Sequence, residues 1–156
     1  MIILRAIRSD EFSGFCDYFI NDYANEIANN YGHTLENSLL QAKQSLLQSF
    51  PEDEIPQSVH LLCIETSDIY DSKHVGYLWY SENSAEQSVF INDFYIFDQF
   101  RSLGYGRAAM VKLEQRMLES GLKQIKLRVA YDNKRALALY EEIGFSVTGI
   151  NMAKSI

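Results

Sequence analysis

The sequence predicts a mixed α/β fold, in which helices flank a sheet that contains both antiparallel and parallel strands. Its segments indicate, in order, a strand, two helices, three strands, a helix, a strand, a helix and a strand. Three consecutive strands favour antiparallel pairing, whereas the alternation of strands and helices in the second half favours parallel crossovers. The 156 residues are 47% hydrophobic and 22% charged, which excludes a disordered chain and fits one domain over residues 1–156.

The first half is expected to start with a strand over residues 2–7, followed by two helices. Ser9 or Asp10 is suited to cap the first helix, because either side chain can accept hydrogen bonds from free N–H groups. The second helix is expected over residues 34–50, and the loop 51–56 after it contains both prolines. Apolar residues recur at helical spacing in both helices: Phe12, Cys16, Phe19, Tyr23 and Ile27, then Leu35, Leu39, Ala42, Leu46 and Phe50.

The second half is expected to begin with strands 60–65 and 75–81, joined by a polar hairpin, and a longer strand 88–97. A helix then starts after Gly104 and ends at Gly121, with Ala109, Met110, Leu113 and Met117 on its inner face. A strand over residues 124–130, a helix capped by Asn133 and stopped by Gly144, and a last strand over residues 145–154 complete the order.

Cysteine and histidine usage favours a reducing compartment without a metal site. Cys16 and Cys63 lie in unrelated segments without C-x-x-C spacing, so we expect two small buried thiols and no disulfide. The three histidines are scattered, without the spacing of metal ligands. The apolar run before Arg5 is too short for a signal peptide, and no window suits a membrane helix, so we expect a cytoplasmic protein.

Charge is distributed unevenly along the chain. Residues 101–135 hold nine Lys or Arg against three Asp or Glu, whereas residues 1–100 hold four against sixteen. The net charge of −7 argues against a general nucleic-acid binder. The asymmetry indicates a site where an anionic and a cationic ligand meet.

The basic stretch opens with a glycine loop of the form R-x-x-G-x-G, made by Arg101, Gly104 and Gly106. It lies between a strand and a helix, where the free N–H groups of the first helical turn bind a phosphate or pyrophosphate. Arg101 and Arg107 add positive charge. Gly104, Gly106 and Ala109 also fit G-x-G-x-x-A, one form of the dinucleotide fingerprint of oxidoreductases. Against that alternative, six residues separate the strand from the glycines, and no acidic residue lies about 20 positions further on.

A second motif, N-x-x-A-x-x-x-Y-x-x-x-G-F, is made by Asn133, Ala136, Tyr140, Gly144 and Phe145. Together and in this order, the two motifs resemble the two signatures of the GNAT superfamily of N-acetyltransferases. The resemblance implies a GNAT fold, with a central mixed six- or seven-stranded sheet flanked by four helices. The segment 76–79, G-Y-L-W, and the tail 148–154, T-G-x-N-M-x-K, resemble a bacterial branch of that superfamily. Asp98 stands where the family often has proline.

The resemblance implies an acetyl-CoA-dependent N-acetyltransferase, in which an amine attacks the thioester directly and no metal takes part. Tyr140 would be the general acid that protonates the CoA thiolate. Asp93 is the first candidate for the general base and Glu26 the second, although Asp22 and Glu26 can instead hold a cationic acceptor. The expected acetyl-CoA contacts are Tyr95, Ile96, Phe97, Arg101, Ser102, Leu103, Gly104, Tyr105, Gly106, Arg107, Asn133, Ala136 and Tyr140, with the N–H of Ile96 facing the thioester carbonyl.

The acceptor would be a small amine or an amine of a peptide or protein, and the acidic first half favours a cationic one. The alternative from another class is a non-catalytic acyl-CoA-binding or regulatory module of the same fold. The 20 aromatic residues belong to the core, the acceptor cleft or a homodimer interface, and the sequence leaves these options open.

Overall fold

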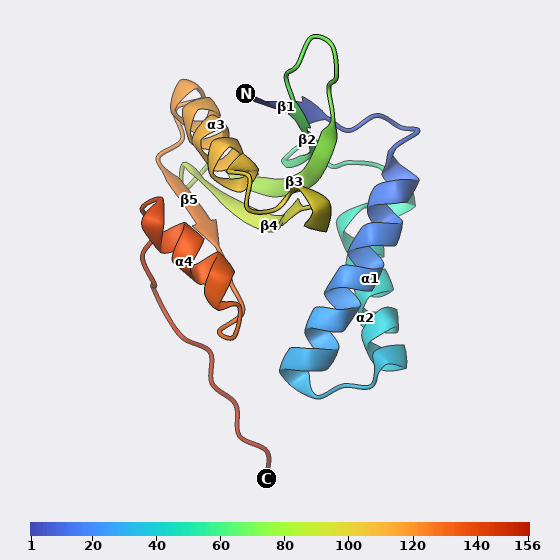
Figure 1. Cartoon of the computed structure of the whole chain (residues 1–156). Helices are drawn as coiled ribbons and strands as arrows, with labels where there is room; N and C mark the ends of the chain where they lie inside the picture. The colour runs from blue at the N-terminus through green and yellow to red at the C-terminus, as the bar shows by residue number, and fades with distance from the viewer.

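A five-stranded mixed sheet forms the centre of the computed structural model, which describes the whole backbone and the side chains of residues 1–29 and 32–156. The strands lie in the order β1-β2-β3-β4-β5; the first four are antiparallel, and β5 pairs in parallel with β4 (Figure 1). The elements are β1 (Ile2–Ala6), α1 (Phe12–Tyr31), α2 (Leu35–Ser49), β2 (Val59–Thr66), β3 (His74–Asn83), β4 (Ser88–Ile96), α3 (Tyr105–Glu119), β5 (Gln124–Leu127) and α4 (Lys134–Glu142).

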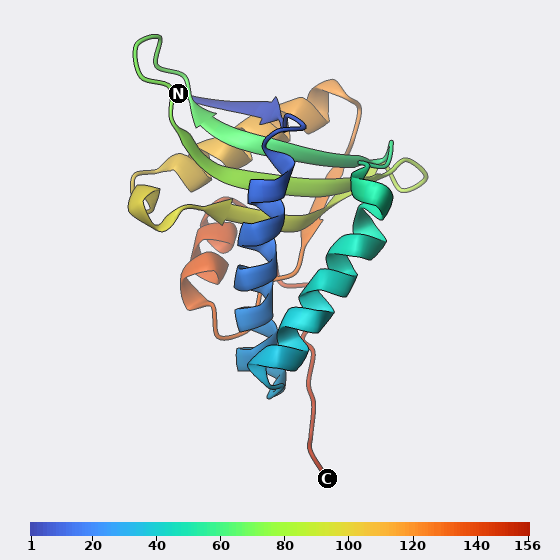
Figure 2. The same ribbon diagram turned by 90° about the vertical axis from the view of Figure 1, so that its right-hand side faces the viewer.

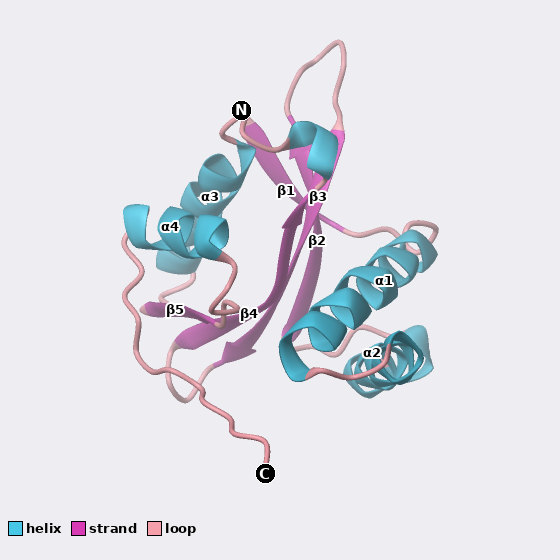
Figure 3. Ribbon diagram, turned by 60° about the horizontal axis from the view of Figure 1, so that its bottom comes forward, coloured by secondary structure: helices cyan, strands magenta, loops and turns pink.

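Two helices cover each face of the sheet, with α1 and α2 on one side and α3 and α4 on the other (Figure 3). The side chains of β2 alternate between these two layers. Leu62 and Ile64 belong to the core under α3, whereas Leu61 and Cys63 belong to the core under α1 and α2. A strand buried on both faces shows a continuous apolar run, because alternate side chains serve opposite layers. None of the helices in the described chain is long and apolar enough to cross a membrane.

The expected Asn133 cap of α4 is present, and Thr34, the expected first residue of the second helix, is the cap of α2. Thr34 Oγ1 accepts a hydrogen bond of 3.2 Å from the N–H of Asn37, and Asn133 Oδ1 accepts one of 3.2 Å from Ala136. The expected cap of the first helix is wrong, because Glu11 occupies that position and makes no capping bond. Its carboxylate instead forms an ion pair with Arg5, whose Nη2 lies 2.9 Å from Glu11 Oε1.

The sheet has five strands rather than the six or seven expected, because residues 145–156 form no strand. A strand exists only where a neighbouring backbone completes its hydrogen bonds, and this segment leaves the molecule beyond α4 (Figures 1 and 2). The strand expected over 124–130 likewise ends at Leu127, where its pairing with β4 stops.

The two cysteines are free thiols, and Cys63 is buried while Cys16 is half-buried. Burial raises the pKa of Cys63 to about 12 and that of Cys16 to about 11. Both thiols therefore stay protonated and poorly nucleophilic near neutral pH.

Candidate active site

The site is created by the divergence of β4 from β5. The two strands pair only over Ser88–Ile91 and Gln124–Leu127, while β4 continues along β3 as far as Ile96. The divergence starts at a bulge, because Trp79 pairs with Asp93 whereas the next residue of β3, Tyr80, pairs with Ile91. The extra residue between them is Asn92. An extra residue twists its strand away from a neighbour, so one edge of β4 opens beyond the bulge.

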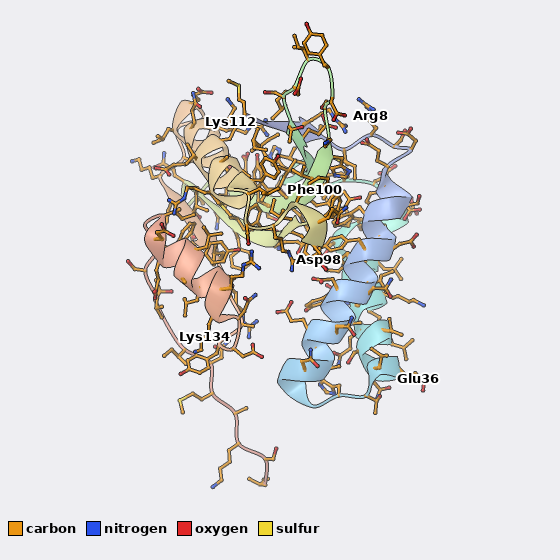
Figure 4. All side chains as sticks on the ribbon, viewed as in Figure 1. Arg8, Glu36, Asp98, Phe100, Lys112 and Lys134 are labelled. Atoms are coloured by element: carbon orange, nitrogen blue, oxygen red, sulfur yellow. The ribbon has the colours of Figure 1, made fainter. Side chains whose placement is uncertain are left out.

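An open cleft of about 890 Å³ lies at this edge. It is lined by α1 on one side, by the start of α3 and by α4 on the other, and by β4 between them. In Figure 4, Asp98 and Phe100 mark the turn that leads from β4 to α3, and Lys134 marks the start of α4. Segments far apart in the sequence therefore meet around the free edge of β4.

Backbone groups of β4 face this cleft. The N–H of Phe97 donates to Val75 O of β3 at 2.9 Å, so the alternation of the strand turns the N–H of Ile96 toward the opposite, open edge. The carbonyl of Ile96 accepts a bond of 2.8 Å from Arg101 Nε, which holds the turn after β4. The N–H of Phe94 donates to the Asp93 carboxylate. Ile96 is thus a position of β4 whose N–H is directed toward the open edge beside the cleft.

The first turn of α3 faces the same cleft. Gly104 precedes the helix with a φ of 84°, a left-handed conformation that favours glycine, and the first turn contains neither a side-chain cap nor an acidic residue. A Cβ at Gly106 would contact Leu139 at 3.6 Å and Ile96 and Phe94 at 3.8 Å, at the floor of the turn. The uncapped first turn of α3 therefore presents backbone N–H groups that are suited to an anionic ligand.

Three arginines surround this turn, and their partners differ. Arg101 lies 2.9 Å from Asp98 Oδ1 and 4.9 Å from the centre of the Tyr95 ring. Arg107 forms an ion pair with Glu142 of α4. Arg135, at the start of α4, donates from Nη2 to Ser102 Oγ at 2.5 Å. Sequence reasoning missed Arg135, because its partner Ser102 lies 33 residues away along the chain.

Asp93 lies on the cleft wall, and its Oδ2 accepts a hydrogen bond of 2.8 Å from the phenol of Tyr18. Burial, with the charges of Asp22 and Glu26, raises the pKa of Asp93 to about 7, although the bonds from Tyr18 and Phe94 act in the opposite direction. The carboxylate can therefore take up and release a proton near neutral pH. Tyr18 was not predicted, because nothing in its own segment indicates a partner 75 residues away.

Tyr140 faces the cleft from α4 and packs against Phe145 with ring centres 5.6 Å apart. Burial and the charge of Asp93 raise the pKa of Tyr140 to about 12, so its hydroxyl carries a proton across the neutral range. Asp22 and Glu26 project from α1 into the cleft, and burial raises the pKa of each carboxyl. The cleft thus combines a proton acceptor, a proton donor and further carboxylates.

The structure brings most of the predicted site residues together and leaves two aside. Phe97 does not line the cleft; its ring packs 5.0 Å from His74 and 5.5 Å from Tyr77, on the α1 side of the sheet. Leu103 is exposed at the outside of the glycine turn. The predicted residues that line the cleft are Glu26, Asp93, Tyr95, Ile96, Arg101, Ser102, Gly104, Tyr105, Gly106, Arg107, Asn133, Ala136 and Tyr140. Within the described residues, no group of three or more His, Cys, Asp or Glu side chains could hold a metal ion.

Comparison with known proteins agrees with this geometry. Residues 20–145 match the sequence profile of the acetyltransferase (GNAT) family. The chain belongs to the GNAT family. This GNAT protein is an N-acetyltransferase, and the family uses acyl-CoA, so the dinucleotide interpretation of the glycine loop is wrong.

Two uncharacterized N-acetyltransferases of Bacillus subtilis (strain 168) are similar to this GNAT chain along its length. YycN is 27% identical over 157 residues, which cover 99% of each chain, and YdgE is 24% identical over 98% of this chain and 97% of that one. The crystal structure of YycN has a TM-score of 0.91 at 28% identity, covering 100% of this chain and 99% of that one.

A more distant crystal structure, that of a spermidine N-acetyltransferase from Vibrio cholerae in complex with CoA and spermine, shares the fold. Its TM-score is 0.66 at 19% identity, and the match covers 95% of this chain and 82% of that one. The GNAT architecture of the sheet and its four helices is thereby established.

Proposed function

We propose that this enzyme transfers the acetyl group of acetyl-CoA to a primary amine of a cationic acceptor, by direct attack of the amine on the thioester. One observation carries the proposal: Asp93 and Tyr140 line one cleft, and their pKa values of about 7 and about 12 suit a base and an acid. Two titratable groups with separated pKa values at one site are the arrangement that general acid–base chemistry requires.

The open edge of β4 and the start of α3 fit the acyl donor. The N–H groups after Gly104, with the positive end of the helix dipole, are suited to its pyrophosphate, and Arg101 and Arg135 add charge beside them. The pantetheine arm would run along Tyr95 and Ile96, like an added strand at the edge that β5 leaves. The CoA in the Vibrio cholerae structure supports a CoA donor in this fold.

The chain's own residues would then handle the protons. An alkyl ammonium, with an ordinary pKa of about 10, must lose a proton before it can attack, and Asp93 would accept that proton directly or through water. The nitrogen lone pair forms the C–N bond while the N–H of Ile96 stabilises the charge on the thioester oxygen. The C–S bond breaks, Tyr140 donates its proton to the thiolate, and the second amine proton leaves to water.

The acceptor would be held by the carboxylates of α1. Asp22 and Glu26 are buried enough to raise their pKa values, and both line the same cleft as Asp93. A cationic group placed between them would lower those values again, because an opposite charge favours the ionised form. The spermine in the Vibrio cholerae complex supports a polyamine-like acceptor as the first class to test.

The test is calorimetric titration with acetyl-CoA and with NADH, followed by assays of thiol release with amines of increasing positive charge. We expect micromolar binding of acetyl-CoA, no binding of NADH, and turnover that rises with the charge of the amine. Absence of acetyl-CoA binding would contradict the donor site, and turnover with neutral amines alone would contradict the cationic acceptor.

A further inference from the structure

The indole of Trp79 carries the one buried side-chain nitrogen or oxygen that has no hydrogen-bond partner among the described residues. Trp79 is 4% exposed, and its ring centre lies 5.4 Å from that of Phe19 and 4.9 Å from that of Phe50. A buried indole N–H usually has a partner, because leaving it unpaired costs free energy. An oxygen atom from a bound molecule would remove that cost.

Trp79 borders the catalytic cleft at the end that α2 closes. Trp79 lines this cleft, and it packs on Phe50, the residue that follows α2. The residues that α2 itself contributes to the lining are Ser45 and Ser49, both neutral and polar. This end of the cleft therefore differs from the acidic wall of α1 and is suited to an uncharged, polar part of the acceptor.

The bulge of β4 places a second donor on the same face. Neighbouring residues of a regular strand point to opposite faces, whereas a bulge re-aims a side chain. Asp93 faces α1, where Tyr18 bonds to it, and Asn92 Oδ1 accepts a bond of 2.8 Å from Ser81 Oγ. Ser81 lies two residues after Trp79 on β3 and therefore on the same face. The bond occupies the amide oxygen of Asn92, whose NH2 group can donate into the cleft that Asn92 lines.

We propose that Trp79 Nε1 and Asn92 Nδ2 bind a neutral oxygen, a carbonyl or a hydroxyl, of the acceptor whose amine is acetylated. The inference rests on the proposed function and narrows its acceptor. Trp79 is the pairing partner of Asp93 across β3 and β4, so the oxygen would lie beside the proposed base. An anionic oxygen is disfavoured, because Asp93, Asp22 and Glu26 line the same cleft. An amine without an oxygen would leave the indole N–H unpaired, and a site of this kind discriminates against such a molecule.

The two donors differ in access. Asn92 is exposed, whereas Nε1 of Trp79 is buried. The oxygen would therefore meet the amide of Asn92 first and reach the indole as neighbouring side chains rearrange around the acceptor.

Two pairs of amines test the proposal, and the members of each pair share one positive charge and a similar carbon frame. Nα-acetyl-lysine amide is compared with pentylamine, and glucosamine with cyclohexylamine. With saturating acetyl-CoA, we expect kcat/KM to be at least about tenfold higher for the oxygen-bearing member of one pair. Preference in the first pair indicates a peptide-like acceptor, and preference in the second an amino sugar.

The ratio of the two kcat/KM values in the preferred pair should fall toward one in Trp79→Phe and in Asn92→Leu. Each variant removes one N–H donor and retains an apolar side chain. Because the ratio compares two amines on the same variant, a general loss of folded protein or of activity cancels. If Trp79→Phe does not fold, Asn92→Leu provides the test from an exposed position. Asn21→Leu, at an exposed asparagine of α1 outside the cleft lining, is the matched control and should keep the wild-type ratio.

The fluorescence of Trp79 provides a second measurement that needs no turnover, because the sequence contains one tryptophan. A hydrogen bond from the indole N–H stabilises the polar excited state and moves the emission to longer wavelength. With CoA bound, the oxygen-bearing amine of the preferred pair should produce this shift, and its oxygen-free counterpart should not.

Equal kcat/KM values within both pairs would overturn the proposal, and so would a wild-type ratio in both variants. An emission that no amine moves would also overturn it, because the indole would then not meet the acceptor. Failure of the proposed function has a different result, namely no binding of acetyl-CoA or no turnover with any amine, and it would overturn both. Turnover without preference for the oxygen-bearing amine would overturn the oxygen subsite alone.

Discussion

The phenol of Tyr18 donates a hydrogen bond of 2.8 Å to Asp93 Oδ2 and thereby connects helix α1 to the strand at the centre of the cleft. Tyr18 also packs on Tyr95, with ring centres 4.4 Å apart, so its position is fixed from two sides. Three other titratable groups face Asp93: Asp22 and Glu26 from α1 and Tyr140 from α4. The bond from Tyr18 stabilises the ionised carboxylate against the burial and like charges that disfavour it.

Tyr18→Phe should therefore shift the pH dependence of kcat/KM. Removing the bond raises the pKa of Asp93, so the acidic limb of the profile moves to higher pH, by about one unit for a bond to a charged group. The phenyl ring keeps its contact with Tyr95. Steady-state kinetics between pH 5 and pH 9 would measure the shift, with Tyr70→Phe in the exposed β2–β3 loop as control. A limb that stays in place or moves to lower pH would refute the assignment.

Asp93→Asn should abolish turnover and yet stabilise the fold above neutral pH. The pKa of Asp93 is raised to about 7, so the folded state binds a proton that the unfolded state releases near pH 4. The free energy of unfolding therefore falls as the pH rises from about 4 to about 7. Above about pH 7, the folded state bears the full cost of the buried, ionised carboxylate. The neutral amide avoids that cost, which a shift of about three pKa units puts at up to about 4 kcal/mol at pH 8. Urea unfolding at pH 8 and pH 5 would measure it; a variant less stable than the wild type at pH 8 contradicts the account.

Arg135→Gln should weaken binding of acetyl-CoA about tenfold, corresponding to about 1.4 kcal/mol, without changing kcat at saturation. Arg135 is held against the glycine turn by Ser102, whereas its neighbour Lys134 lies over the ring of Tyr131, 3.6 Å from its centre. Lys134→Gln removes the same charge from the same helical turn and is the matched control. An equal loss of acetyl-CoA affinity in the two variants would contradict a specific role for Arg135, because the general positive charge of this turn would then account for both losses.

Gly76→Ala should destabilise the protein and impair catalysis together. A Cβ at Gly76 would lie 2.0 Å from the carbonyl oxygen of Tyr95, so β3 and β4 must separate at the position of Ile96. The cost falls in the range of about 1–3 kcal/mol for forced backbone shifts. Gly14→Ala, where the added atom would lie 3.8 Å from the Tyr77 hydroxyl, is the control and should be neutral or stabilising. Thermal unfolding and kcat measure the two effects; an active, stable Gly76→Ala protein would contradict the geometry.

Much of the architecture was predictable because helices, hairpins and caps leave local signals in the sequence. The apolar spacing of α1 and α2, the cap residue Asn133 and the glycine turn at Gly104 each predicted the element that is present. The order of strands and helices along the chain predicted the mixed sheet. The match to the GNAT family agrees with the two sequence motifs.

The features that local signals did not indicate all depend on contacts between distant segments. The partner of Asp93 lies 75 residues away, and the bond from Arg135 to Ser102 joins residues 33 apart. The bulge at Asn92 follows from the pairing register with β3, which alternation within one strand does not reveal. The prediction of a last strand is wrong for the same reason. Residues 145–154 have a strand-like composition but no neighbouring backbone to pair with in the described chain.

The most direct test of the central claim is the turnover of Tyr140→Phe, measured as CoA thiol release with a cationic amine, alongside calorimetric binding of acetyl-CoA. We expect kcat to fall at least about 100-fold, as for loss of a general acid, with the dissociation constant of acetyl-CoA unchanged. Tyr131→Phe, an exposed tyrosine ahead of α4, should behave as the wild type. Undiminished turnover of Tyr140→Phe would contradict the proposed proton transfer to the CoA thiolate.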